Sequence, residues 1–349
     1  AIPFQAMGYA LKPTMVTQMV VYADTAPIAT GRDDDLGGVW TNVWGGRHTL
    51  QCRVWDGKGN SAASAAVTVT VLGPSCRPPA VNDFDGDRRS DLALYGNGAW
   101  SVVYMKGGGF EGVFGDASCR PVAGDFNGDG YADRAVYQDS SGAWGLTLSG
   151  APVPVIALFG LPGVLPVPGD FNGDGQADLA VYHPASGSWY YRPSGEPDVA
   201  YRHGWLGGAA WSPAAGDFDG DGRADFGVYQ AESASWYVQL SASGQIGGLS
   251  LGGPGCVPVP GYYDYDYQAD PAVYDPHAGL WTARLSGYGY QPFFVALAPG
   301  GLPVRGDFDG DRRSDLLTYT EAIGTWQGYL TARGWVHGQF GGPGWIPVR

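Results

Sequence analysis

Acidic residues recur along this 349-residue chain at one fixed spacing. The repeated pattern, written GDFDGDGRADFGVY at residues 216–229, places Asp or Asn at positions 1, 3, 5 and 9 of a nine-residue loop. We call these segments the Asp loops and number them 1 to 6. They cover residues 83–91, 125–133, 170–178, 217–225, 262–270 and 307–315. Their first positions lie 42 to 47 residues apart, so the chain is built from a repeat.

Oxygen atoms at this spacing predict calcium sites. Four carboxylates, one main-chain carbonyl at position 7 and water would form a shell of about six or seven oxygens, which suits Ca²⁺ better than Mg²⁺. No His or Cys lies in the loops, which argues against zinc. Gly at position 4 of five loops lets the chain turn tightly around an ion. The predicted ligands are Asp83, Asp85, Asp87, Arg89, Asp91, Asp125, Asn127, Asp129, Tyr131, Asp133, Asp170, Asn172, Asp174, Gln176, Asp178, Asp217, Asp219, Asp221, Arg223, Asp225, Asp264, Asp266, Asp270, Asp307, Asp309, Asp311, Arg313 and Asp315.

Two other interpretations of the loops are weaker. An EF-hand needs a Glu at position 12 and flanking helices, but position 12 is Leu, Val or Thr here and the sequence that follows favours strands. Asp and Asn also favour ordinary turns. Six copies with the same spacing of oxygens favour metal binding over simple turns.

Loop 5 departs from the pattern. Tyr262 replaces the first Asp, and Tyr265 and Tyr267 stand where other loops have Gly or Arg. We expect this calcium site to be the weakest or empty. The tyrosines are expected to pack between loops, with contact to a ligand as the alternative.

The charge balance also favours bound cations. The loops hold 21 of the 34 acidic residues, and the net charge is −14. Clustered carboxylates repel one another strongly without a cation. We therefore predict about five or six structural Ca²⁺ ions and expect chelation to destabilise the fold.

The sequence around each loop predicts four short strands. An apolar stretch such as PVPG precedes most loops, a DLAVY-type run follows, and a Trp starts the next run. Four strands in about 45 residues are typical of a propeller blade. The repeated Trp and Tyr are expected to pack between blades rather than to bind sugars.

These loops resemble the FG-GAP (VCBS-type) repeats of integrin-α-like β-propellers. The resemblance covers residues 74–349 and implies an all-β, six-bladed propeller with calcium in the loop between the two inner strands of each blade. The C-terminal segment 345–349 matches the strand before each loop. The sequence leaves three alternatives open: this segment is a surplus copy of that strand, it closes the ring of blades, or it binds a partner.

Residues 1–73 lack the repeat. The segment 45–71, with GRHTLQCRVWDGKGN followed by VTVTV, resembles the last strands of a bacterial Ig-like domain, so we expect a small β-sandwich here. Its apolar segment 1–18 is shorter than the N-terminal part usual in the family, by about one strand's worth of sequence. The alternative is that residues 37–73 belong to a seventh blade.

The apolar N-terminus suggests self-assembly. Residues 1–22 carry one charged side chain, Lys12. An unpaired apolar strand tends to aggregate. Residues 1–11 of one chain could complete a sheet in the next and build a head-to-tail filament. The alternative is pairing within the same domain.

Composition excludes several classes of protein. Gly and Pro make up 84 residues, which argues against long helices. The acidic charge argues against a nucleic-acid binder, and the most apolar stretch, residues 151–169, contains five prolines and is no membrane span. The four cysteines do not demand disulfides. Cys76 and Cys119 are the best candidates for a pair, because they precede adjacent loops in nearly the same register.

No catalytic motif is present, so the chain is expected to be no enzyme. We predict a secreted or cell-surface calcium-binding protein with a structural or adhesive role. The alternatives are a carbohydrate-binding lectin, with Trp205, Trp211, Trp335 and Trp345 as candidate contacts, and an accessory module of a polysaccharide-degrading system. Possible partners are the chain itself, glycans or surface proteins.

Overall fold

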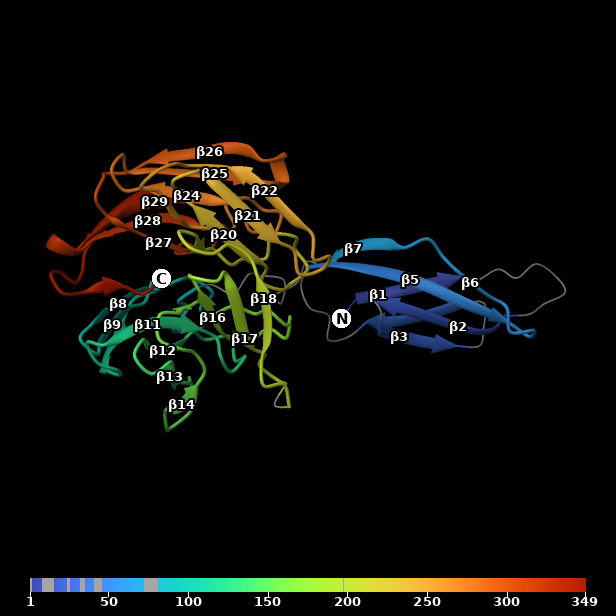
Figure 1. The fold of residues 1–349 in the computed structure, drawn as a ribbon. Helices are drawn as coiled ribbons and strands as arrows, with labels where there is room; N and C mark the ends of the chain where they lie inside the picture. The colour runs from blue at the N-terminus through green and yellow to red at the C-terminus, as the bar shows by residue number, and fades with distance from the viewer. Residues whose placement is uncertain are drawn as a thin grey trace. The chain divides into compact units, whose positions relative to one another are not determined.

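The computed structural model describes residues 2–7, 16–23, 26–31, 35–40, 46–71, 81–196 and 198–349. The chain divides into two compact units, residues 1–77 and 78–349. The described residues form β-strands and two short 3-10 helices, η2 (Ser286–Tyr288) and η3 (Glu321–Ile323), as expected for an all-β protein (Figure 1). No helix among these residues is long and apolar enough to cross a lipid bilayer.

The C-terminal unit contains six antiparallel sheets of four strands each. The strands of the first three sheets are β8 (Leu92–Gly96), β9 (Ala99–Val103), β10 (Gly109–Val113) and β31 (Ile346–Pro347); β11 (Cys119–Gly124), β12 (Asp133–Gln138), β13 (Ala143–Thr147) and β14 (Val155–Leu158); and β15 (Leu165–Pro166), β16 (Leu179–His183), β17 (Ser188–Arg192) and β18 (Arg202–Trp205). Those of the last three are β19 (Ser212–Pro213), β20 (Phe226–Gln230), β21 (Ser235–Gln239) and β22 (Ile246–Ser250); β23 (Val257–Pro258), β24 (Ala272–Asp275), β25 (Leu280–Leu285) and β26 (Gln291–Ala296); and β27 (Leu302–Gly306), β28 (Asp315–Thr320), β29 (Thr325–Leu330) and β30 (Gly334–Gln339). This is the propeller-like repeat that the sequence predicted.

The repeated aromatic residues form the core of each sheet. In every sheet a Tyr of the second strand is paired with a Trp of the third, as for Tyr229 and Trp236. The ring centroids of these six pairs lie 4.9 to 5.5 Å apart, and the rings are buried. Each apolar cluster also includes residues of the next sheet, such as Val273 beside Trp236. The prediction that these rings pack rather than bind sugars is confirmed.

Hydrogen bonds between the Asp loops link the six sheets into a ring. In each case the backbone N–H at position 8 of one loop donates to the carbonyl of position 1 in the preceding loop, at 2.6 to 2.7 Å. The sixth bond, from Ser90 N–H to the Asp307 carbonyl, joins loop 1 to loop 6 and completes the circle. The apolar clusters close in the same way, because Leu94 of the first sheet packs with Leu317 and Tyr319 of the last.

The C-terminal strand completes the first sheet. β31 pairs with β8, with Ile346 opposite Tyr95 and Pro347 opposite Leu94, and the N–H of Val348 donates to the carbonyl of Ala93. Figure 1 places the C-terminus beside β8. Of the three alternatives that the sequence left open, the structure shows the second: the C-terminal segment closes the ring, because the last strand of the chain belongs to the first sheet.

The N-terminal unit has a five-stranded and a two-stranded sheet among its described residues. Its strands are β1 (Ile2–Met7), β2 (Val16–Ala23), β3 (Ala26–Gly31), β4 (Asp35–Trp40), β5 (Gly46–Asp56), β6 (Ser61–Ala63) and β7 (Val67–Val71). The larger sheet has the order β3-β2-β5-β6, and β7 pairs with the first half of β5. Each of these strands pairs with another strand of the N-terminal unit, and none of them pairs with a sheet of the C-terminal unit. The Ig-like assignment stays a prediction.

Strand β1 pairs with β4 of the same chain, with Ile2 opposite Trp40. This pairing is the intrachain alternative to strand donation, and the filament stays a prediction. Cys52, Cys119 and Cys256 are free thiols. Cys76, the expected partner of Cys119, lies outside the described residues.

We predict that the close contact between neighbouring loops makes the inner ring intolerant of larger side chains. A Cβ atom at Gly216 would lie 2.9 Å from the Cβ of Ala269 in the next loop. Gly216→Ala should therefore lower the free energy of unfolding by about 1–3 kcal/mol through overpacking, measured by thermal or urea unfolding. Gly338→Ala is the matched control, because no atom lies within 4 Å of a Cβ there. Equal stability of the two variants would contradict the tight ring.

Candidate metal centres in the Asp loops

The first carboxylate of each regular loop organises the backbone around it. In loop 4, which connects β19 to β20, Asp217 Oδ1 accepts hydrogen bonds from the N–H groups of Gly220 at 2.7 Å and Asp221 at 3.1 Å. Asp217 Oδ2 accepts from Gly222 N–H at 2.9 Å. Loops 1, 2, 3 and 6 repeat this arrangement. The loop therefore closes around its first Asp.

The carboxylate at position 9 fastens the loop to the sheet. Asp225 Oδ2 accepts a hydrogen bond from Phe218 N–H at 2.7 Å, and its Oδ1 accepts from Ser241 N–H at 2.6 Å, just after the third strand β21. All six equivalent carboxylates make this pair of bonds. They are almost completely buried, at 0 or 1% exposed. The predicted ligands at positions 1 and 9 are thus fixed by backbone donors.

A hydroxyl group that the sequence analysis missed completes five of the loops. Ser241 donates from its Oγ to Asp221 Oδ2, the carboxylate at position 5, at 2.7 Å. The equivalent donors are Ser149, Ser194, Ser286 and Thr331. Each lies 16 residues after position 9 in a motif such as LSG or LTA, and this constant offset could have revealed it.

Three loops bring three carboxylates close together. Carboxylate oxygens lie within 4.8 Å of one another in three groups: Asp83, Asp85 and Asp91; Asp217, Asp219 and Asp225; and Asp307, Asp309 and Asp311. Loops 2 and 3 carry an amide at position 3 instead. There the side-chain N–H of Asn127 donates to Asp129, and that of Asn172 to Asp174. Each of these five loops offers only oxygen ligands, which fits a hard cation such as Ca²⁺.

Burial makes these carboxylates costly to ionise without a cation. Desolvation raises the pKa of Asp217 to about 8, and backbone hydrogen bonds offset this only in part while the neighbouring carboxylates raise it further. Desolvation likewise raises the pKa of Asp91, Asp225 and Asp315 to about 7. A bound dication would favour the ionised forms, because opposite charge lowers a carboxylate's pKa.

Position 7 plays a packing role in addition to its predicted ligand role. The side chain of position 7 in one loop covers position 4 of the preceding loop, as Arg223 covers Gly173 and Gln176 covers Gly128. Position 4 therefore needs Gly both for its positive φ and because a side chain occupies the space of a Cβ. Coordination by the main-chain carbonyls of position 7 stays a prediction.

Loop 5 uses its tyrosines for contacts between neighbouring loops. Tyr262 packs against the apolar cluster of the fourth sheet. Tyr265 occupies the place of Gly at position 4, and the guanidinium of Arg313 lies 4.7 Å from its ring centre. Arg312 donates to the hydroxyl of Tyr267 at 3.4 Å. The expectation of packing between loops is confirmed, whereas the weakness of this calcium site stays a prediction.

Loop 1 contains a cation of its own. Lys106 Nζ lies 3.1 Å from Asp85 Oδ2, and the Asp85 side chain is 5% exposed. Met105 donates its N–H to Asp91, as the serines do in other repeats, but has no hydroxyl to offer. An ammonium group therefore sits beside the carboxylates of this loop, a feature that the sequence analysis missed.

The four tryptophans considered for sugar binding fall into two pairs. Trp205 and Trp335 are 64% and 65% exposed. Trp211 and Trp345 are partly buried against the apolar clusters of the third and sixth sheets. Only the exposed pair therefore presents most of its ring to solvent.

Several solved structures show a distant likeness to this chain. Virginiamycin B lyase from Staphylococcus aureus has a TM-score of 0.47 and 10% identity, over 70% of this chain and 78% of the lyase. An auxiliary nutrient binding protein from Bacteroides ovatus has a TM-score of 0.45 and 10% identity, over 92% of this chain and 78% of that protein. Scores this low say nothing about activity or ligands.

The family comparison concerns the repeats themselves. No curated protein sequence matches this chain. Residues 166–228, which run from β15 through loops 3 and 4 into β20, match the model of the FG-GAP-like repeat. The other four loops repeat the same spacing outside this segment. The chain thus carries FG-GAP-like repeats, as the loop pattern predicted.

Proposed function

We propose that this chain is a non-enzymatic, secreted or cell-surface protein whose six-bladed β-propeller is stabilised by structural calcium. The observation that supports calcium most strongly is the set of buried position-9 carboxylates, two of which, Asp91 and Asp225, lie in clusters with two other loop carboxylates. Five loops share one all-oxygen donor set, which fits Ca²⁺. Calcium at extracellular concentrations would neutralise this charge.

The proposed role is to present surfaces for adhesion or binding on a rigid scaffold. An Ig-like domain in residues 1–73 would act as a spacer or second binding module. Carbohydrate binding, as a lectin or as an accessory module of a polysaccharide-degrading system, is the second candidate, because exposed aromatic side chains lie outside the repeated core positions. Self-assembly through residues 1–11 is a weaker extension, since β1 already has a partner in its own chain.

Calcium should raise the melting temperature of the full chain. With several sites occupied at saturating calcium, we expect a rise of at least about 10 °C over the protein in excess chelator. Asp221→Asn should reduce this rise, because it removes a position-5 carboxylate from a complete loop. The matched change Asp266→Asn in loop 5 should leave it nearly unchanged. A melting temperature that is the same in calcium and in chelator would refute the proposal.

The calcium-free protein should become more stable as the pH falls from 8 to 5. The pKa values of Asp217 and Asp225 in the folded chain, about 8 and about 7, lie above the value of about 3.9 in an unfolded chain. The folded state therefore binds more protons in this range, so the free energy of unfolding falls as pH rises and is lowest above pH 8. Thermal unfolding in chelator should show a melting temperature higher by about 5 °C at pH 5 than at pH 8.

Calcium should reverse this trend, because protons compete with the ion for the carboxylates. The measurement is the same pH series with saturating calcium. A calcium-free protein that loses stability steadily on acidification would show that the loop carboxylates are not protonated in the folded chain.

Lys106 should matter mainly when calcium is absent. Its ammonium offsets repulsion in loop 1, and because Lys106 is exposed to solvent we expect the ion pair to raise the melting temperature by only about 1–3 °C. Lys106→Ala should lower the melting temperature in chelator by about this amount and change it little in calcium. Lys58→Ala, at an exposed lysine far from any Asp loop in sequence, is the control. An equal loss in both conditions would mean that Lys106 does not substitute for a cation.

A further inference from the structure

We propose that one face of the third sheet is an oligosaccharide-binding site, formed by Tyr190, Tyr201, His203 and Trp205. We call this group the aromatic face. Its rings form a continuous series, with centroids 5.9 Å apart for Tyr190 and Tyr201, 6.4 Å for Tyr190 and His203, and 4.8 Å for His203 and Trp205. This site goes beyond the structural calcium role and does not depend on it.

The strand register places these rings on the same side of the sheet. His203 lies opposite Tyr190 and Trp205 lies opposite Ser188 in the pairing of β18 with β17. Side chains two residues apart share a face and are separated by about 6.7 Å along a strand. Tyr201, His203 and Trp205 therefore span about 13 Å.

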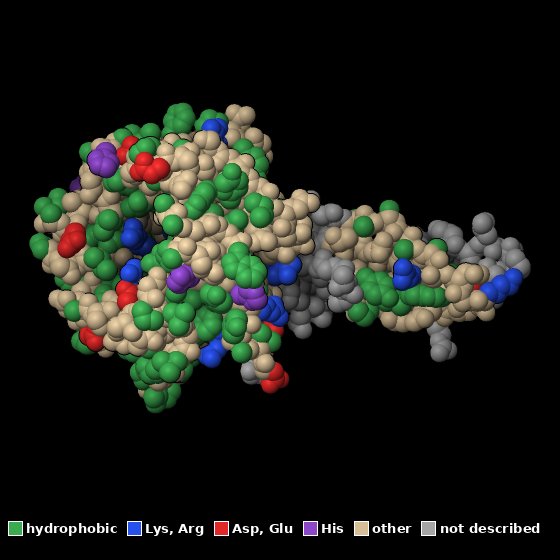
Figure 2. Space-filling model, in the orientation of Figure 1, with side chains coloured by type: hydrophobic (Ala, Val, Ile, Leu, Met, Phe, Trp, Pro, Cys, Tyr) green, Lys and Arg blue, Asp and Glu red, His purple; other side chains and the backbone are tan. Residues whose placement is uncertain are grey.

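Both sides of these strands contact the core, and on the aromatic face Tyr190 is partly buried against the apolar cluster of the second sheet. Trp189 of β17 is buried and stacks on Phe226 of the fourth sheet at 5.0 Å. Tyr201 and Trp205, in contrast, are 55% and 64% exposed. Tyr201 and Trp205 therefore expose apolar ring surface that contributes little to the packing of the fold. Figure 2 shows hydrophobic and His side chains together on the surface over β18. Exposed apolar groups clustered in this way mark a binding surface.

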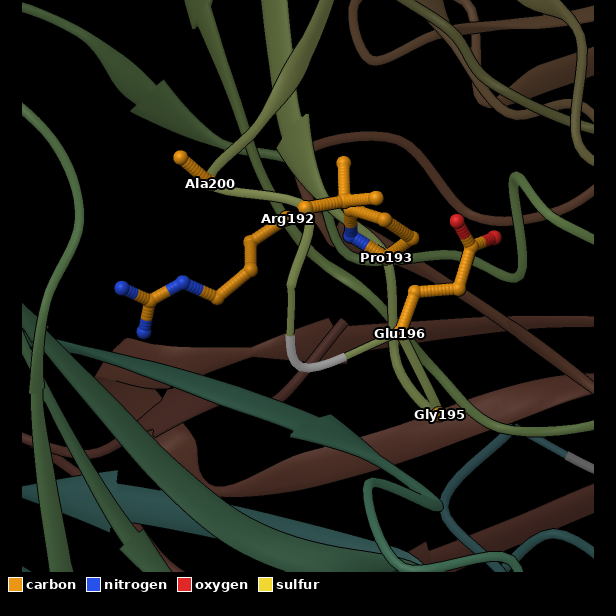
Figure 3. A pocket seen from close by; sticks show the side chains of 6 residues that line it. Arg192, Pro193, Gly195, Glu196 and Ala200 are labelled. Carbon is orange, nitrogen blue, oxygen red and sulfur yellow. The ribbon is translucent and has the colours of Figure 1, made fainter.

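A pocket of about 510 Å³ lies at the end of β17, next in sequence to the aromatic face, and is lined in part by polar groups. Its lining includes Arg192, Glu196 and Ala200, the residue before Tyr201. Figure 3 shows Arg192 and Glu196 pointing to different sides of the turn that they flank. The volume is within the usual range of about 300–1,000 Å³ for small-ligand sites.

The two charged side chains of the pocket differ in their contacts. Glu196 Oε2 accepts a hydrogen bond from Arg202 at 2.6 Å, which fixes it in place. Arg192 forms no ion pair among the described residues, and its guanidinium lies 5.8 Å from the ring centre of Phe159. This guanidinium therefore keeps free donors, and the alternation along β17 places Arg192 on the same side of the sheet as Tyr190.

This combination fits a sugar better than an apolar protein segment. A pyranose ring has an apolar C–H face that stacks on a flat side chain and hydroxyl groups that hydrogen-bond to imidazole and guanidinium groups. The outer strand of the second sheet is a useful contrast. There Val155, Ile156 and Leu158 are exposed, and Figure 2 shows mainly hydrophobic side chains over β14.

The test uses the full chain in calcium on an array of neutral and acidic oligosaccharides. We expect binding to one structural class, with the acidic arm showing whether Arg192 binds a carboxylate. Trp205→Ala and Tyr201→Ala should each weaken that binding at least tenfold. Trp335→Ala is the matched control, since it removes an equally exposed Trp from another sheet and should bind as the unmodified chain does.

Thermal unfolding of each variant in calcium separates loss of the site from loss of the fold, and an unchanged melting temperature is expected. Absence of binding to every glycan on the array would overturn the proposal, as would full binding by Trp205→Ala or loss of binding through Trp335→Ala alone. The calcium proposal is decided separately, by the melting temperatures in calcium and chelator.

Discussion

Burial of six position-9 carboxylates is the constraint on which the propeller unit depends. Each of these groups receives one N–H from its own loop and one from the end of the third strand, so it joins a loop to its sheet. Such a bond is strong when the carboxylate is charged. Burying that charge is unfavourable, however, unless a cation or a proton compensates for it. The regular loops place further oxygens around the same point, which is the arrangement that would hold a cation.

The inner ring couples the loops to one another. Each loop donates a backbone hydrogen bond to the preceding loop, and its position-7 side chain covers position 4 of that loop, which is Gly in five loops and Tyr265 in loop 5. The order of one loop therefore supports the next. Because the bond from Ser90 to Asp307 closes the circle and β31 completes the first sheet, both ends of the repeat are held together. Two loops handle charge differently: loop 1 adds Lys106, and loop 5 replaces its first carboxylate with Tyr262.

Much of the architecture follows from the sequence because the repeat is local and periodic. The Asp spacing, the strand runs and the paired Tyr and Trp predicted the four-stranded sheets, and the buried Trp236 with its neighbour Tyr229 shows why: an aromatic pair fills the same space in every sheet. The constant offset of Ser241 and its equivalents from the Asp loops is also visible in the sequence. Its structural role is not, because that role depends on a hydrogen bond to Asp221, twenty residues away.

Contacts between distant residues could not be derived in this way. Lys106 lies beside Asp85 only because the paired strands β8 and β9 return the chain to its loop. Trp205 was a candidate because of its place outside the repeat, but Tyr190 joins the same series of rings only through the pairing of β17 with β18, which puts it opposite His203. The closing role of residues 346–347 likewise required the register between the first and last strands of the unit.

The number of calcium ions per chain tests the central claim most directly. Native mass spectrometry of the full chain, after removal of loosely bound metal, counts ions without assuming which loops hold them. The account predicts five or six calcium ions per chain, released together with a broad loss of structure when the metal is removed. A chain that retains its fold with no bound calcium, or that holds only one ion, would contradict it.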